Sequence, residues 1–188
     1  VINYVDPVDL VYSHTDSPYF DDIYYVGEIK TIPINELVKQ FPHLTSKDLE
    51  EIIKTGGNNH GSRANKRNES DKDENKVDIL YFNYKTYMSE VYKLKESASG
   101  GEKAIEKDDS FNPPEGDDAN FSKESRKMEV LYDGALVLGT KKLLKWEMAK
   151  NMMRPKSDFT KVKMNYAIVA PRMYDGRIDS LVKRITGF

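Results

Sequence analysis

The sequence predicts an α+β fold: a β-rich domain with a β-hairpin, two or three short helices and long polar loops. Runs of valine, leucine, isoleucine and tyrosine of strand length recur along the 188 residues. Two shorter segments, 34–41 and 45–55, instead place apolar residues at helical spacing. Between the apolar runs lie two long stretches, 58–76 and 97–125, that are polar and highly charged, as solvated connections are.

The N-terminal third begins with β-leaning residues. Segment 1–13 favours a strand, interrupted at Asp6-Pro7 because proline cannot donate to a sheet ladder. Segment 15–22 has the aspartate, serine and proline of a loop. Segment 23–32 returns to strand composition, and Gly27 is a candidate bulge position.

Two helices follow. Pro33 opens the first, Pro42 ends it, and one face is apolar through Ile34, Leu37, Val38 and Phe41. In the second, Thr45 and Asp48 are spaced as an N-terminal cap and its capping-box partner, and Leu44 and Leu49 as a hydrophobic staple. Its predicted buried stripe is Leu49, Ile52 and Ile53, and Gly56-Gly57 stop it.

The middle of the chain contains one ambiguous segment between two predicted loops. Segment 58–76 is expected to be a polar loop. Segment 77–95 alternates as a strand, although its second half also has helical spacing, and its aromatic and β-branched content favours the strand. The alternating apolar residues are Leu80, Phe82, Tyr84, Met88, Tyr92 and Leu94. Segment 97–125 is expected to be a second polar loop, with Gly100-Gly101 and Pro113-Pro114.

Asp133-Gly134 is the strongest turn signal, because Asp-Gly supplies the positive φ angles of a type I′ turn. The predicted hairpin pairs Tyr132 with Ala135 and Leu131 with Leu136, which makes both faces apolar near the tip. Such a hairpin must be covered on each side, by a small two-layer domain or by a neighbouring copy of the chain. The candidate interface residues are Tyr132, Leu136, Val137 and Trp146; the alternative is that they form an intramolecular core.

The C-terminal part is expected to contain further short elements. Segment 141–150 has the composition of a third strand or of a short helix. Segment 164–170 is expected to be a strand ended by Pro171, and segment 178–185 the first turns of a helix.

Composition and motif spacing exclude several classes of site. With no cysteine, the chain has no disulfide framework, zinc knuckle or thiol nucleophile. The histidines lie far apart, and the partial calcium-loop and phosphate-loop patterns lack required residues. No apolar run has the length of a membrane span. We therefore expect no catalytic residues, no cofactor and no metal site.

Charge is distributed unevenly although the net charge is only −2. Residues 1–22 hold five acids and no lysine or arginine, whereas residues 141–184 hold twelve basic and four acidic residues. Such an asymmetry is typical of a protein whose basic part binds an anionic partner, or whose copies make complementary contacts with one another. The alternative is that the basic residues form a solvated surface. The candidate residues for contact with DNA or an acidic partner are Lys141, Lys142, Lys145, Lys150 and Arg154.

Four collinear segments together resemble the portal protein of crAss-like tailed bacteriophages. They are YVDPVDLVYSHTDSPYFDDIYYVGEIKTIPINELVKQFP, YKTYMSEVYKLKESASGGEKAIEKDDSFNPP, VLYDGALVLGTKKLLKWEMAKNMMRP and YAIVAPRMYDGRIDSLVKRI. The resemblance implies a segment of a longer subunit: a wing- or stem-side α+β part at 1–57, the polar loop at 58–76, a β-rich clip-like domain at 77–170 and the start of a stem-like helix at 171–188.

The resemblance also implies a function. Portal proteins form rings, typically of about twelve subunits, at one vertex of the capsid. The ring passes double-stranded DNA without sequence specificity and docks the terminase and then the head–tail connector or tail proteins. The expected location is the virion, after assembly in the host bacterial cytoplasm, with no membrane partner. Two alternatives remain: a small nucleic-acid-binding module that uses the basic C-terminal third, and an enzyme whose site the motifs do not reveal.

Overall fold

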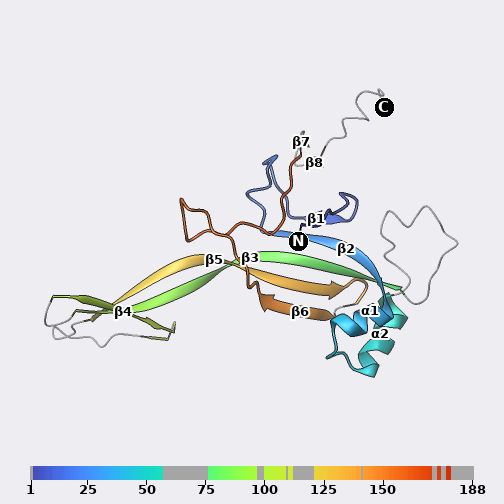
Figure 1. Ribbon diagram of the computed structural model, residues 1–188, viewed down its shortest axis with the longest axis horizontal. Coiled ribbons are helices and arrows are strands. Elements are labelled where there is room, and N and C mark those ends of the chain that lie inside the picture. Colours follow the sequence, from blue (N-terminus) through green and yellow to red (C-terminus); the bar gives the residue numbers. More distant parts are fainter. Residues whose placement is uncertain are drawn as a thin grey trace.

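The computed structural model describes residues 2–56, 76–96, 100–108, 110–111, 121–140, 142–170, 173–174 and 177–178. These residues form an α+β fold around a six-stranded antiparallel sheet with the strand order β1-β2-β3-β5-β6, in which β4 also pairs with β3 (Figure 1). The elements are β1 (Leu10–Tyr12), β2 (Tyr25–Pro33), α1 (Ile34–Gln40), α2 (Ser46–Gly56), β3 (Lys76–Glu96), β4 (Glu102–Lys107), β5 (Phe121–Val137), β6 (Leu143–Met148), β7 (Met173–Tyr174) and β8 (Arg177–Ile178).

Two long strands form the axis of the molecule. β3 has 21 residues and β5 has 17, and they pair from Ile79↔Val137 to Lys95↔Phe121. At about 3.4 Å per residue this ladder is about 55 Å long. β2 pairs with β3 only as far as Tyr84, and β4 pairs with it from Val91 onward. The distal part of the ladder (residues 88–96, 102–107 and 121–128, the arm) therefore projects away from the helices (Figure 1).

The predicted hairpin at Asp133-Gly134 is wrong. β5 continues through these residues, and Tyr132 pairs with Tyr84 and Met148, not with Ala135. The chain turns later, at residues 138–140, where Gly139 has a φ of 81°. Gly134 instead lies between Phe82 and Trp146 in the sheet. The glycine makes room for an aromatic ring.

Helices α1 and α2 cover one face of the sheet at the end where β2, β3, β5 and β6 meet (Figure 1). As predicted, the helices begin after Pro33 and Thr45. Thr45 and Asp48 form a reciprocal capping box: the Thr45 amide donates to the Asp48 carboxylate at 3.0 Å, and the Asp48 amide donates to the Thr45 hydroxyl at 3.3 Å. The shared core consists of Ile32, Leu37, Phe41, Ile52, Val77, Ile79, Ala135, Val137 and Leu144.

The buried stripes of both helices are narrower than predicted. Leu37 and Ile52 are fully buried, whereas their neighbours Val38 and Ile53 are 40% and 43% exposed. Each helix packs on the sheet from one side only. Val38 and Ile53 each come one position after the buried residue of their helix. Their side chains therefore point past the edge of the contact between helix and sheet.

Segment 149–170 wraps over the same sheet face as the helices, mostly without regular structure. It buries Ala149 and Val162 against Leu131, and Ala170 against Phe20 and Val26. The prediction of a strand at 164–170 is wrong, although the burial of the side chains does alternate along this segment. Packing against β1 and β2 produces the alternation without the ladder hydrogen bonds of a strand.

Of the remaining predictions of secondary structure, some are confirmed, some are wrong and some lie outside the described residues. Segment 77–95 is a strand, as favoured, and 141–150 contains strand β6. Gly27 pairs in register with Phe82 and forms no bulge. β4 and the start of β5 lie inside the stretch 97–125 that was expected to be a loop. Most of the predicted helix at 178–185 and of the loop at 58–76 lies outside the described residues, and Ile178 belongs to β8.

The sheet is continuous across the two main predicted segments, 1–57 and 77–170. β2, from the first segment, pairs with β3, from the second, along all 9 of its residues. α1 and α2 share one core with β3, β5 and β6. The two segments are therefore parts of one packed body.

Candidate functional site

The sheet face opposite the helices carries an apolar surface that the described residues leave uncovered. Strand alternation places Leu80, Phe82 and Tyr84 on this face, while Val77, Ile79 and Tyr81 face the helices. Val11, Tyr25, Tyr132, Leu136, Trp146 and Met148 join it from the neighbouring strands. We call this surface, from β1 to β6, the open face.

An aromatic cluster forms its centre. Trp146 stacks on Tyr132 with ring centroids 4.9 Å apart and an interplanar angle of 11°. Phe82 and Tyr84 each lie 6.0 Å from the Trp146 ring. Trp146 nevertheless stays 47% exposed. Because large apolar surfaces favour burial, an exposed cluster of rings is typical of a contact surface.

Beside the cluster lies a shallow apolar cavity of about 240 Å³, lined by Val11, Tyr25, Gly27, Leu80, Phe82, Tyr84 and Leu136. Gly27 lines this cavity, and Gly134 leaves room for the Phe82 ring that borders it. A Cβ atom on Gly27 would lie 2.7 Å from the Phe82 Cβ, and one on Gly134 would lie 2.6 Å and 2.7 Å from the Phe82 ring Cε atoms. The lining residues include none that is charged at neutral pH. The cavity can hold an apolar group and offers no acid–base chemistry.

The four predicted interface residues separate into two sets. Tyr132, Leu136 and Trp146 lie together on the open face. Val137 has no exposed surface and packs in the core beneath the helices, so it is not available to a partner. Sequence reasoning placed Phe82 and Tyr84 on the alternating apolar face of segment 77–95 but did not name them as interface residues. Only the pairing of β3 with β5 and of β5 with β6 shows that this face lies beside Tyr132 and Trp146.

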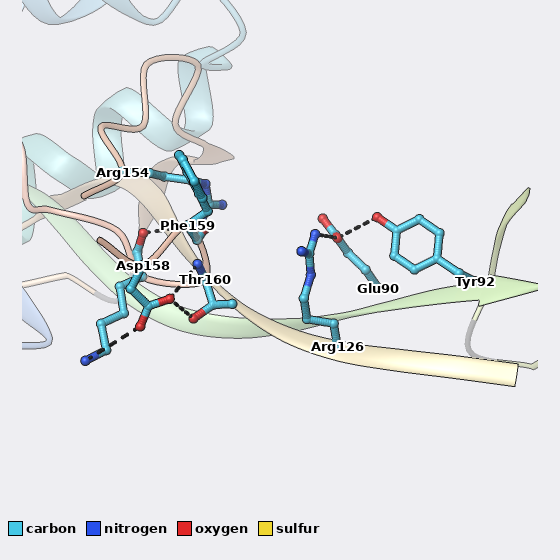
Figure 2. A network of polar contacts seen from close by, with 8 residues as sticks. Glu90, Tyr92, Arg126, Arg154, Asp158, Phe159 and Thr160 are labelled. Atoms are coloured by element: carbon cyan, nitrogen blue, oxygen red, sulfur yellow. Dashed lines mark hydrogen bonds and ion pairs between the residues drawn. The ribbon is translucent and has the colours of Figure 1, made fainter. Parts of the chain in front are cut away.

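The predicted basic residues do not form one surface. Lys142 pairs with Asp48 on α2. The Lys145 ammonium lies 3.0 Å from the carboxylate of Glu147 and 3.9 Å from the carboxylate of Asp133. Arg154 donates to the carbonyl oxygens of Phe159 and Lys161, which closes the loop at 154–161 (Figure 2). Lys150 is exposed, and Lys141 lies outside the described residues.

The Asp48–Lys142 pair is the main electrostatic link between the helices and the sheet. The Lys142 ammonium donates to the Asp48 carboxylate, which also accepts from the Thr45 amide. Lys142 first, and then Thr45, lower the pKa of Asp48 to about 2. This carboxylate stays ionised, and so keeps its role in the cap, at any ordinary pH.

A second polar group lies on the arm. Arg126 on β5 donates to the Glu90 carboxylate on β3 at 2.9 Å, and the Tyr92 hydroxyl donates to the same oxygen at 2.8 Å (Figure 2). The Arg126 guanidinium, followed by the Tyr92 hydroxyl, lowers the pKa of Glu90. The Arg126–Glu90 bond joins the two long strands at the point where they leave the body of the molecule, and Tyr92, on the same strand as Glu90, holds the carboxylate in place.

A larger cleft of about 590 Å³ lies between α1 and β6, and its lining is mixed: Gln40, Phe41, His43, Tyr81, Leu144, Lys145, Trp146 and Glu147. The Tyr81 hydroxyl donates to Gln40 at 2.7 Å, and Lys145 pairs with Glu147. Most polar groups of this cleft are therefore already paired with one another. In the part of the chain that the structure describes, no three His, Cys, Asp or Glu side chains gather as metal ligands.

Comparison with known protein families finds no family that matches this chain. No curated protein matches it either. Among the described residues, none of the helices is both long and apolar enough to cross a membrane.

Proposed function

We propose that this chain is a structural segment of a phage portal subunit. It acts through its shape and its contacts in a homo-oligomeric ring at the capsid vertex, and not as an enzyme. Double-stranded DNA passes through the ring, and terminase and then the head–tail connector dock on it. The proposal combines the resemblance of the four sequence segments with one structural observation: the open face is apolar across five strands.

The open face supports an assembly role on energetic grounds. A sheet with both faces apolar belongs in a layered structure, with another element on each side. The helices and segment 149–170 supply one layer. Burying apolar surface is worth about 25 cal/mol per Å². A neighbouring subunit that covers Trp146 and the cavity beside it therefore gains a substantial part of its association free energy there.

A nucleic-acid-binding module built on the basic C-terminal third gains less support. Lys142 and Lys145 are paired with acids of the same chain, and Arg154 is used within its own loop. Each phosphate contact needs a cation that can approach the backbone of the nucleic acid. DNA contact is therefore proposed only as the weak, salt-sensitive contact of a channel through which DNA slides.

The test is assembly of the full-length protein under conditions that favour portal formation. We expect rings with a central channel by electron microscopy and a matching large species by sedimentation velocity. Trp146→Ser combined with Tyr132→Ser is expected to shift the protein toward smaller species. Tyr19→Ser is the matched control, since Tyr19 is 72% exposed and lies outside the open face.

Two results would contradict the proposal. One is a full-length protein that stays monomeric under all assembly conditions. The other is a structure of the full-length protein in which the open face is covered entirely by the same polypeptide. Circular dichroism of the variants checks that any loss of assembly does not come from unfolding.

A further inference from the structure

The arm separates its charges onto two opposite faces. In the register of β3, β4 and β5, odd-numbered residues pair with odd-numbered ones and even with even. Because side chains alternate across a strand, all the odd residues share one face of the arm and all the even residues share the other. The two faces then differ sharply in charge.

The odd face is basic. Within the arm it presents six lysines and no acid among the described side chains: Lys93, Lys95, Lys103, Lys107, Lys123 and Lys127. The even face is acidic. Among the side chains that the structure describes, it presents four glutamates and one arginine, and the arginine is paired with Glu90: Glu90, Glu102, Glu106, Glu124 and Arg126. We call these surfaces the lysine face and the glutamate face.

This separation costs stability in an isolated arm. Lys95 lies directly opposite Lys103. Lys93, on the same face, has its ammonium over the Phe111 ring, 5.8 Å from the centroid. Like charges at directly opposed positions of a sheet destabilise it, whereas opposite charges stabilise it. Every residue of β4 is exposed, so burial in the chain's own core does not explain the pattern. A partner that neutralises the faces does explain it.

We propose that the lysine face of one copy's arm docks on the glutamate face of the arm of the next copy. This inference rests on the proposed ring and names a contact within it. A contact between two different surfaces of identical chains is heterologous, and heterologous contacts generate rings when the rotation closes. The charges match in kind, and both complementary surfaces are carried by the same chain.

Binding of a nucleic acid explains the charge separation of the arm less well than contact between copies does. The phosphates of a nucleic acid would neutralise the lysine face and leave the glutamate face unexplained. The charges of the two faces lie on opposite sides of a single sheet, within about two Debye lengths of each other, where one Debye length is about 8 Å at physiological ionic strength. The glutamates would therefore weaken the attraction of a polyanion. Contact between copies neutralises both faces at once.

The test uses two full-length variants with opposite designs. In the first, Lys95→Glu, Lys103→Glu, Lys107→Glu and Lys127→Glu leave two lysines against four glutamates on the lysine face, so both faces of the arm are acidic. In the second, Glu102→Lys, Glu106→Lys and Glu124→Lys make both faces basic. All seven side chains are exposed, so the variants are expected to fold, and circular dichroism verifies this.

Each variant alone is expected to associate at least tenfold more weakly than the wild type in sedimentation velocity. An equimolar mixture is expected to associate with alternating copies, because an acidic arm then meets a basic one. Wild-type association is expected to weaken with added salt. If the mixture associates no better than either variant alone, the docking proposal is overturned.

Two further outcomes separate this proposal from the proposed function. If both variants form rings as well as the wild type does, the arm contact is wrong and the portal assignment stands. If the first variant assembles normally but loses affinity for a DNA duplex in fluorescence anisotropy, the lysine face binds DNA and not another copy of the arm. The docking proposal is then overturned. Pairing between the mixed variants needs no closed ring, so it can be read even if full-length rings are never observed.

Discussion

The ring of Phe82 on β3 lies over the backbone of Gly134, its direct neighbour on β5. Gly27 flanks Phe82 on its other side, so an aromatic residue sits between two glycines in one row of the sheet. This arrangement holds the ring flat on the open face beside Trp146. It also explains why Asp133-Gly134 looks like a turn in the sequence while the structure has none there.

Replacing Gly134 with alanine is therefore expected to destabilise the protein. The added Cβ would lie 2.6 Å from a Phe82 ring carbon, which forces the ring or the strand to move. Overpacking of this kind costs about 1–3 kcal/mol, measured as the free energy of unfolding in urea. Gly101→Ala is the control, since a Cβ there meets nothing within 4 Å. If Gly134→Ala costs as much in a Phe82→Ala background, the ring is not the cause.

Truncation of Leu37 is expected to loosen α1 from the sheet. Leu37 is fully buried, and Leu→Ala changes at such positions cost about 2–5 kcal/mol because they leave a cavity. Val38→Ala on the same helix is expected to change the free energy of unfolding by less than about 0.5 kcal/mol, since Val38 is 40% exposed. Equal effects of the two substitutions would show that the face of α1 is assigned wrongly.

Asp48→Asn is expected to lower stability in a pH-dependent way. The folded-state pKa of Asp48, about 2, is below its ordinary value of 3.8. The carboxylate therefore contributes stability that is present above pH 3.8 and lost as the pH falls through about 2. The urea midpoints of wild type and variant should differ at neutral pH and converge over that acid range. Lys142→Gln should reduce the difference, and a difference that does not change with pH would contradict this assignment.

Tyr166 is expected to make stability fall in alkali. Burial, followed by the nearby charges of Glu28 and Asp133, raises its pKa to about 12 from an ordinary value of 10.0. The stability linked to its proton is complete below pH 10 and is lost as the pH rises to about 12. Tyr166→Phe should remove this component from the pH dependence of unfolding. The phenol absorbance of the folded wild type should show one late-ionising tyrosine that the variant lacks.

Local chemistry was enough to locate the helices. Pro33, the Thr45–Asp48 box and the apolar spacing of Leu37 and Ile52 act within one or two helical turns, and the structure confirms both helices. Strand composition likewise placed β2 and β3, where β-branched and aromatic residues alternate. The α+β class follows from these elements.

Tertiary structure decided what local patterns leave open. A glycine after an aspartate permits a turn or makes room for a ring, and only the partner strand, with Phe82 opposite, selects the second. Tyr132 and Val137 look equally apolar in the sequence, but residues of odd and even number face opposite sides of a sheet, so one lies on the open face and the other in the core. The charge separation of the arm is encoded in the sequence, yet it becomes visible only when the register aligns three strands, because pairing between strands is set by contacts far apart along the chain.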